Sequence, residues 1–269
     1  MNVLSTEFYA TPGRHTDVTG FGLQVSSVEE AVRVVQGLLV YDLAAKDLYG
    51  VELTAAQAGA VHERDAAALL ELARTIDPRP LDQPRNPGER IGGRCNTYTL
   101  LTVALLRAAG VPARSRCGFG AYFVQGFYED HWVAEVWQRD RWVMVDAQLD
   151  EIQREALGVT FDPLDVPNDL FADPGAVAGD SLPPEGSLLP VETQQFLVAG
   201  RAWQLCRSGA VDPQRFGIFD SRGEEFVAGN VVRDALALNS VEILPWDMWG
   251  AMPVPGGDRA DAMDRPFLE

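Results

Sequence analysis

The sequence predicts an α+β fold in which an antiparallel sheet packs against one helix that begins near Cys95. Residues 96–109 form an apolar run that ends at a glycine, with a proline two residues beyond, and these are typical signals for the end of a helix. Residues 131–137 and 142–146 are rich in β-branched and aromatic residues, and a short polar loop joins them as a hairpin. Additional helices are expected on both sides of this core.

Cys95 is the first candidate catalytic residue. The free N–H groups and partial positive charge of a helix N-terminus favour an anion such as a thiolate. A free thiol has a pKa of about 8.5, and a helix N-terminus or a nearby imidazolium lowers such a pKa by several units. Gly92 and Gly93, just before it, are expected to let the backbone bend and a substrate approach. Cys117 and Cys206 are instead interpreted as small buried apolar groups.

The hairpin supplies an imidazole and a carboxylate. Side chains alternate along a strand, so His131 shares one face with Val133. If Trp137 lies opposite Trp142, Asp146 falls opposite Val133 and becomes a diagonal neighbour of His131. A slip of one residue would put the two groups on opposite faces. In the favourable register, His131 holds the thiolate and Asp146 orients the imidazole, which is the arrangement for nucleophilic acyl transfer.

These segments resemble the transglutaminase-like core, over roughly residues 85–150. The resemblance implies a papain-like fold and a Cys-His-Asp triad formed by Cys95, His131 and Asp146. Members of that superfamily include protein cross-linking enzymes, cysteine peptidases, peptide N-glycanases, acyl-transfer enzymes of natural-product pathways and copies with no known activity. The resemblance therefore implies the chemistry better than the substrate. The motifs that carry it occur in the family's order: Gly93-Arg94-Cys95, the run 105–114, Cys117-Gly118-Phe119, His131-Trp132-Val133 and the segment 142–146.

The function expected is acyl transfer through an acyl-cysteine intermediate, without metal or organic cofactor. The acyl donor is a small-molecule, peptide or carrier-bound substrate, and the acceptor is an amine or water. Two alternatives stay open: a cysteine amidase or peptidase, and a catalytically silent binding module, against which the complete Cys-His-Asp set argues. Arg116 and Trp132 are weak candidates for substrate contacts, with surface and core roles as the alternatives. Glu129 and Asp130 are expected to be solvated, or to touch a substrate amine.

The composition of the chain disfavours several classes of binding partner. The chain has 269 residues, a formal net charge of −17 and 46% hydrophobic residues, enough for a sizeable core. An acidic protein is a poor partner for nucleic acid or an anionic membrane, so neither is expected. Three cysteines without a Cys-x-x-Cys motif and three scattered histidines favour neither a disulfide framework nor a metal site. Without a signal sequence or an apolar stretch of membrane-spanning length, a cytoplasmic location is expected, and the oligomeric state stays open.

A single domain over residues 1–269 is expected, with a helical part at 1–84, the catalytic core at 85–150 and a helical extension at 151–269. Ser27 and Glu30 fit a capping box before an amphipathic helix. The remaining elements are expected as follows: irregular structure at 1–24, a helical region at 54–76 that breaks around 59–65, strands at 114–119 and 122–127, a loop at 168–190, helices at 191–207 and 224–238, and an irregular segment from 239 onwards.

Overall fold

The structure, a computed structural model, describes most of the first two thirds of the chain. It describes residues 3–172, 212–218 and 221–223, with Val227, Asn230, Arg233, Asp234 and Ala237. The chain divides into two compact units, one formed by residues 1–115 and 132–167 and the other by the remainder. Strands β3 (Ala113–Val124) and β4 (Phe127–Gln138) contribute residues to both units.

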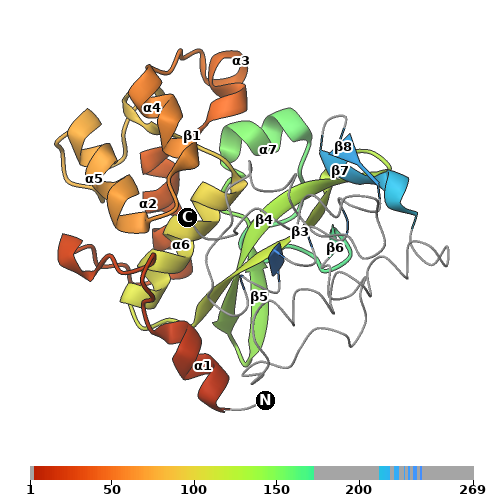
Figure 1. Ribbon diagram of the computed structural model, residues 1–269, viewed down its shortest axis with the longest axis horizontal. Coiled ribbons are helices and arrows are strands. Elements are labelled where there is room, and N and C mark those ends of the chain that lie inside the picture. The colour runs from red at the N-terminus through yellow and green to blue at the C-terminus, as the bar shows by residue number, and fades with distance from the viewer. Residues whose placement is uncertain are drawn as a thin grey trace, which may run out of the picture. The chain divides into compact units, whose positions relative to one another are not determined.

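The fold is mixed α+β, which confirms the predicted class (Figure 1). The larger sheet is mostly antiparallel, and a separate parallel pair of short strands precedes the long helix α6. The remaining bounds are α1 (Val3–Ala10), α2 (Val28–Leu38), β1 (Leu39–Tyr41), α3 (Ala45–Tyr49), α4 (Ala55–Gly59), α5 (Ala66–Ile76), β2 (Ile91–Gly93), α6 (Cys95–Ala108), β5 (Arg141–Val145), α7 (Glu151–Leu157), β6 (Phe171–Ala172), β7 (Phe216–Ile218) and β8 (Ser221–Arg222).

In the first unit, helix starts follow the local signals in the sequence. The Ser27 side chain caps α2 by accepting a hydrogen bond from the Glu30 N–H at 3.1 Å. The expected break in the second helical region is confirmed, because a short 3₁₀ turn (Ala60–His62) separates α4 from α5. Helix α6 is buried over most of its length and contacts α1, α2 and α5, so the apolar run after Cys95 forms the centre of this unit.

The glycines before Cys95 lie in an extended strand, so the expected backbone bend was wrong. Strand β2 pairs in parallel with β1, with Gly92 opposite Val40. A Cβ atom on Gly92 would lie 3.0 Å from the carbonyl oxygen of Gln57, and one on Gly93 would lie 3.2 Å from the Tyr98 ring. Glycine is needed here because neighbouring atoms pack against the bare backbone.

The register of the β4–β5 hairpin is the predicted one. Strand β5 pairs antiparallel with β4, and Trp137 lies opposite Trp142, as predicted. The connection is tighter than expected, because only Arg139 and Asp140 form the turn, with φ values of 51° and 60°. Positive φ at both turn positions is typical of a type I′ hairpin, whose twist matches that of the strands. The ladder reaches Ala134, opposite Val145, immediately before Asp146.

In the second unit, β3 and β4 are connected through Gln125 and Gly126, where Gly126 has a φ of 77°. The predicted strand at 122–127 was therefore wrong, because it runs across this turn. Strand β6 pairs antiparallel with β3 at Phe119, and β7 pairs in parallel with β4 at Tyr128. Strand β8 pairs antiparallel with β7.

Three helices were not predicted, and one of them, α3, lies between the two expected helical regions. Helix α1 lies within residues expected to be irregular, and α7 follows the hairpin with Asp150 as its cap. Part of the expected loop at 168–190 is the short strand β6, and the described residues within 224–238 are helical, in line with the prediction. The predictions for 191–207, including Cys206, and from 239 onwards lie outside the described residues.

Candidate active site

Cys95 is the first residue of α6 and is partly exposed, as the nucleophile hypothesis requires. The residue before it, Arg94, caps the helix in an extended conformation and donates its backbone N–H to the Thr97 hydroxyl at 3.3 Å. Cys117 is fully buried in β3, which agrees with its interpretation as an apolar group. Only Cys95 among these two thiols is open to a reagent.

The Arg94 side chain forms an ion pair next to the thiol, which the sequence did not indicate. Its Nε and Nη2 donate to the two carboxylate oxygens of Asp42, at 3.1 and 3.0 Å. Burial alone would lower the pKa of Arg94, but the hydrogen bonds and charge of Asp42, with smaller contributions from Tyr41 and the Cys95 anion, raise it above its ordinary value. Asp42 therefore fixes a positively charged side chain directly before Cys95 in the chain.

Asp146 directly follows β5 and is 1% exposed. One carboxylate oxygen accepts the backbone N–H of Gln148 at 3.0 Å, and its own N–H donates to the Pro163 carbonyl at 2.8 Å. One more step along the β4–β5 ladder places Val133 opposite Asp146, and His131 lies two residues from Val133 on the continuous strand β4. The observed register up to Val145 is thus the predicted one.

A buried polar network holds the loop after Asp146. The Gln153 amide donates to the Gln148 carbonyl at 2.8 Å and to the Tyr49 hydroxyl at 3.0 Å. Tyr49 in turn donates to Asp150 at 2.7 Å, and burial together with this carboxylate raises the pKa of Tyr49. The network ties the loop to α3 and α7, so the Asp146 backbone has support from two helices.

His131, in β4, is 2% exposed, and two aromatic rings of β3 pack against its imidazole. The ring centroids of Tyr122 and Phe123 lie 5.8 and 4.7 Å from that of His131, both in edge-to-face geometry. A Cβ atom on Gly120 would lie 2.7 Å from the Phe123 ring, so only glycine leaves room for this arrangement. The candidate base is thus held within an aromatic environment.

The other predicted contact residues are buried. Trp132 is 1% exposed, a core position. Arg116 is also buried, and its guanidinium binds both oxygens of Asp234 at 2.8 and 2.9 Å, so a surface role was wrong. Asp130 was expected to be solvated, but it is buried and pairs with Arg233 at 3.1 Å. These partners come from more than 100 residues away, and no local pattern in the sequence indicates them.

Cys95 and Asp146 belong to the first unit, and His131 is the last β4 residue of the second. The family model described as the transglutaminase-like superfamily matches residues 66–147. Residues 66–147 are a transglutaminase-like domain. The match confirms the resemblance and spans all three residues of the predicted triad. Searches of curated proteins and of solved structures found no match.

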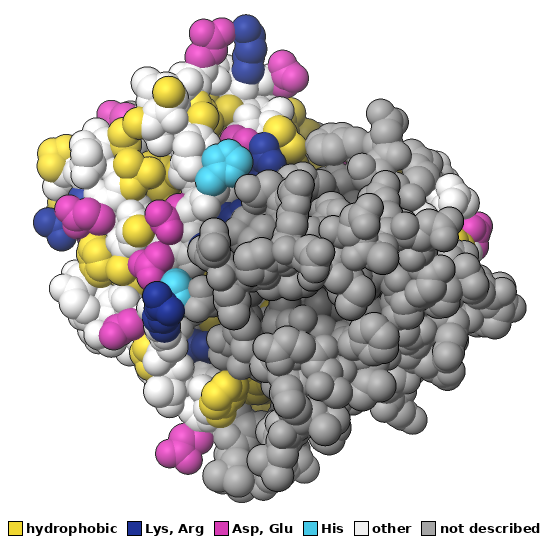
Figure 2. All heavy atoms as spheres, viewed as in Figure 1, with side chains coloured by type: hydrophobic (Ala, Val, Ile, Leu, Met, Phe, Trp, Pro, Cys, Tyr) yellow, Lys and Arg dark blue, Asp and Glu magenta, His cyan; other side chains and the backbone are white. Residues whose placement is uncertain are grey.

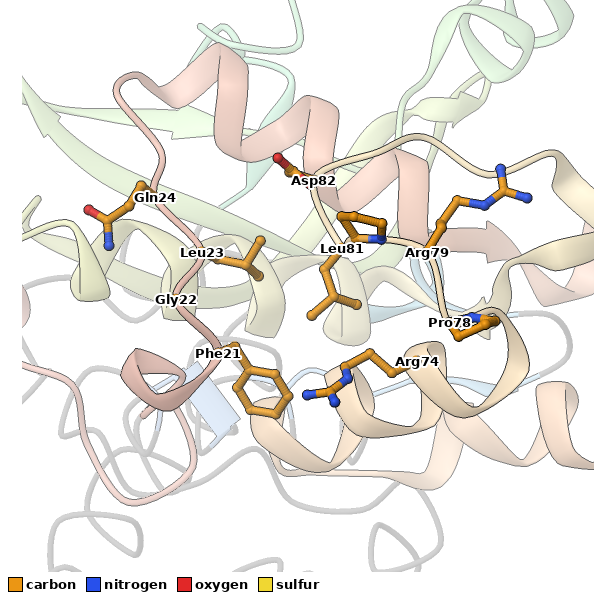
Figure 3. A pocket seen from close by; sticks show the side chains of 10 residues that line it. Phe21, Gly22, Leu23, Gln24, Arg74, Pro78, Arg79, Leu81 and Asp82 are labelled. Carbon is orange, nitrogen blue, oxygen red and sulfur yellow. The ribbon is translucent and has the colours of Figure 1, made fainter.

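Other features lie outside the predicted triad. A pocket of about 430 Å³ is lined by residues 21–24, Arg74 and residues 78–82. Figure 3 shows the Phe21 and Leu81 side chains at this space, and the Arg74 guanidinium lies 6.0 Å from the centre of the Phe21 ring. None of the predicted catalytic residues lines this pocket.

Charged side chains of both signs are interspersed over the described part of the face in Figure 2. Among the residues that the structure describes, no three His, Cys, Asp or Glu side chains form a group that could hold a metal ion. The helices in the same part of the chain include none that is long and apolar enough to cross a membrane.

Proposed function

We propose that the transglutaminase-like domain is a cysteine-dependent enzyme that transfers an acyl group through an acyl-Cys95 intermediate. The observation that carries the proposal is the position of Cys95: a partly exposed thiol at the first residue of a long, buried helix, inside a domain of a mostly cysteine-dependent superfamily. Helix N-termini stabilise thiolates, and thiolates are the nucleophilic form of cysteine.

In this proposal His131 forms an ion pair with the Cys95 thiolate. The thiolate attacks the substrate carbonyl, and the imidazolium then gives its proton to the departing group. The acyl-enzyme is next attacked by the acceptor, whose proton passes to His131, and Cys95 leaves as the thiolate. The backbone N–H of Cys95 is the first oxyanion donor in this scheme.

Asp146 is proposed to orient the imidazole and to stabilise its charged form. Two observations support this role. The predicted β4–β5 register is observed up to Val145, and the Gln148 N–H donates to one of the Asp146 carboxylate oxygens. Arg94 adds positive charge beside the sulfur, and its own position is fixed by Asp42.

The acceptor decides between two outcomes. An amine gives amide formation, whereas water gives hydrolysis of a small-molecule, peptide or carrier-bound acyl substrate. The two outcomes share every step up to the acyl-enzyme, so the donor is the first thing to find. A cysteine amidase or peptidase is the same chemistry with water as the acceptor.

The test is covalent capture of the donor. The Cys95→Ser protein is incubated with cell extract, and the intact mass is measured for an added acyl group, because an oxygen ester breaks down more slowly than a thioester. The expected result is one discrete mass increase that maps to the substituted position, and no increase in Cys95→Ala. If acyl adducts form equally on Cys95→Ala, or not at all on wild type and Cys95→Ser, the proposed intermediate is contradicted.

A further inference from the structure

Asp42 and Arg94 lie at the same end of the parallel strand pair β1–β2, where the chain enters α6. Tyr41, the last residue of β1, pairs with Gly93, the last residue of β2, so the residues that follow the two strands are neighbours. The Asp42 carboxylate accepts hydrogen bonds from Nε and Nη2 of Arg94 at 3.1 and 3.0 Å. Because Cys95 comes next in the chain, the strand register places a paired guanidinium at the start of the nucleophile's helix.

One edge of the Arg94 guanidinium is open. A guanidinium is a planar fork of N–H donors that can bind acceptors on more than one edge, and Asp42 occupies the edge formed by Nε and Nη2. Among the residues that the structure describes, no other group accepts a hydrogen bond from this side chain, so Nη1 is unbonded. The Arg94 side chain is 37% exposed and that of Asp42 only 12%. The solvent-facing member of this ion pair is therefore the cation.

The first turn of α6 adds positive potential at this position. The hydrogen bonds at the start of the helix come from the N–H groups of Thr97 and Tyr98, which both donate to the Arg94 carbonyl. The N–H groups of Cys95 and Asn96 precede them and have no carbonyl acceptor within the helix. Such groups carry the partial positive charge of a helix N-terminus, which favours anions. The open guanidinium edge and the helix start thus attract the same kind of ligand.

We infer that Arg94 forms a subsite for an oxyanion, a carboxylate or a phosphate, on the substrate of Cys95. Guanidinium groups bind both anions through paired N–H donors, and Asp42 on the other edge holds the fork in one orientation. The inference rests on the proposed function in one respect, namely that the bound molecule is the acyl donor. The chain has a net charge of −17 and repels anions at long range, so an anionic donor needs a local cation to bind at Cys95.

The test compares alkylating reagents that differ only in charge. N-iodoacetylglycine carries a carboxylate, whereas N-iodoacetylglycinamide is neutral, and both present the same iodomethyl carbon to a thiolate. The corresponding β-alanine reagents, longer by a methylene, cover a second spacing. Reactions are run at low ionic strength and a pH of about 8.5, where an ordinary thiol also reacts, and peptide mapping restricts the rates to Cys95. The acid-to-amide rate ratio cancels any change in the thiolate fraction, and glutathione gives the reference ratio.

The ratio for the wild type should exceed that for glutathione about 10-fold or more at one spacing at least, because only the acid forms a charged hydrogen bond with Arg94. Arg94→Gln should remove this preference, and Arg94→Lys should restore part of it, since the charge returns without the fork. Arg141→Gln, which removes an exposed arginine of the same unit, should leave the ratio unchanged. Equal ratios in the wild type and Arg94→Gln at both spacings would overturn the subsite.

Protection experiments identify the anion. Phosphate and acetate are compared at equal ionic strength for their ability to protect Cys95 from iodoacetamide. The anion that protects the wild type at the lower concentration, but does not protect Arg94→Gln, is the group that the subsite prefers. If neither anion protects better than chloride, the subsite is contradicted.

The subsite and the proposed function can fail separately. An acid-to-amide ratio that depends on Arg94, in a protein that forms no acyl adduct, would keep the subsite and contradict acyl transfer. Capture of an acyl donor on Cys95→Ser, together with a ratio that does not depend on Arg94, would keep acyl transfer and contradict the subsite.

Discussion

Trp137 lies directly opposite Trp142 in the β4–β5 hairpin, with the ring centroids 5.5 Å apart and the rings inclined at 68°. The Arg114 guanidinium covers the Trp142 ring at 4.1 Å, which adds a further contact to the pair. Because side chains alternate along a strand, this one pair decides which face Asp146 occupies. The proposal that Asp146 orients the His131 imidazole therefore depends on this register.

Asp146→Asn should lower turnover by about 10²–10⁴-fold without unfolding the protein. The amide keeps an oxygen to accept the Gln148 N–H but loses the charge that stabilises an imidazolium. The rate is measured with a captured acyl donor under conditions where chemistry limits turnover. Asp165→Asn, an exposed carboxylate in the same unit, is the matched control. Full activity of Asp146→Asn would assign the orienting role to another group.

Removing either member of the Arg94–Asp42 ion pair should change the alkylation rate of Cys95, in opposite directions for the two residues. Arg94→Gln removes a positively charged side chain directly before the proposed nucleophile, so iodoacetamide should react with Cys95 several-fold more slowly at pH 6. Asp42→Asn leaves the guanidinium without its counter-charge and should make the reaction faster. Arg33→Gln, on the exposed face of α2, should have no effect. Equal alkylation rates in all three variants would show that Arg94 does not affect the reactivity of Cys95.

A stability prediction concerns the buried pair Arg114–Glu135, in which Nε lies 2.7 Å from the carboxylate. Arg114→Met removes the guanidinium that binds the buried Glu135 carboxylate, and should lower the free energy of unfolding by about 3–5 kcal/mol. Arg141→Met breaks the exposed pair with Asp165 and should cost about 1 kcal/mol or less. Urea unfolding of the two variants measures the difference. Similar losses for both would show that the buried pair contributes no more than a surface one.

Gly92→Ala should destabilise the protein by about 1–3 kcal/mol, because its Cβ would press on the Gln57 carbonyl oxygen in a packed interior. Gly59→Ala is the comparison, since no atom lies within 4 Å of its added Cβ. That change should be neutral, or should stabilise the protein by about 0.4–1 kcal/mol, because alanine lowers the conformational entropy of the unfolded chain. Thermal unfolding of both variants gives the comparison, and equal stability would contradict the packing role of Gly92.

Local signals accounted for much of this fold. The Ser27 cap, the helix from Cys95 and the Trp137–Trp142 register follow from capping chemistry, helix-stop residues and strand alternation, each of which acts over a few residues. Helix α7 also had signals in the sequence, since Asp150 caps it and Gly158 ends it in a left-handed conformation. It was not predicted, because a helix of seven residues has too few apolar positions to show a clear period.

Other features depend on contacts that no local pattern contains. Helix α1 is short, and its buried Tyr9 packs against Trp142 and lies beneath the Arg114 guanidinium, so tertiary contacts support it. The burial of Asp130 likewise depends on Arg233, about a hundred residues later in the chain. Charged residues in a strand look solvated until their distant partners are known.

The central claim is that Cys95 is an activated thiol, and competitive alkylation tests it without any substrate. Iodoacetamide is applied near pH 6, well below the pKa of about 8.5 of an ordinary thiol, and peptide mapping follows each cysteine. Cys95 should be labelled first, because Cys117 is fully buried, and the rate should fall sharply in His131→Ala. Faster labelling of another cysteine in the folded protein, or reaction of Cys95 only at alkaline pH, would contradict the account.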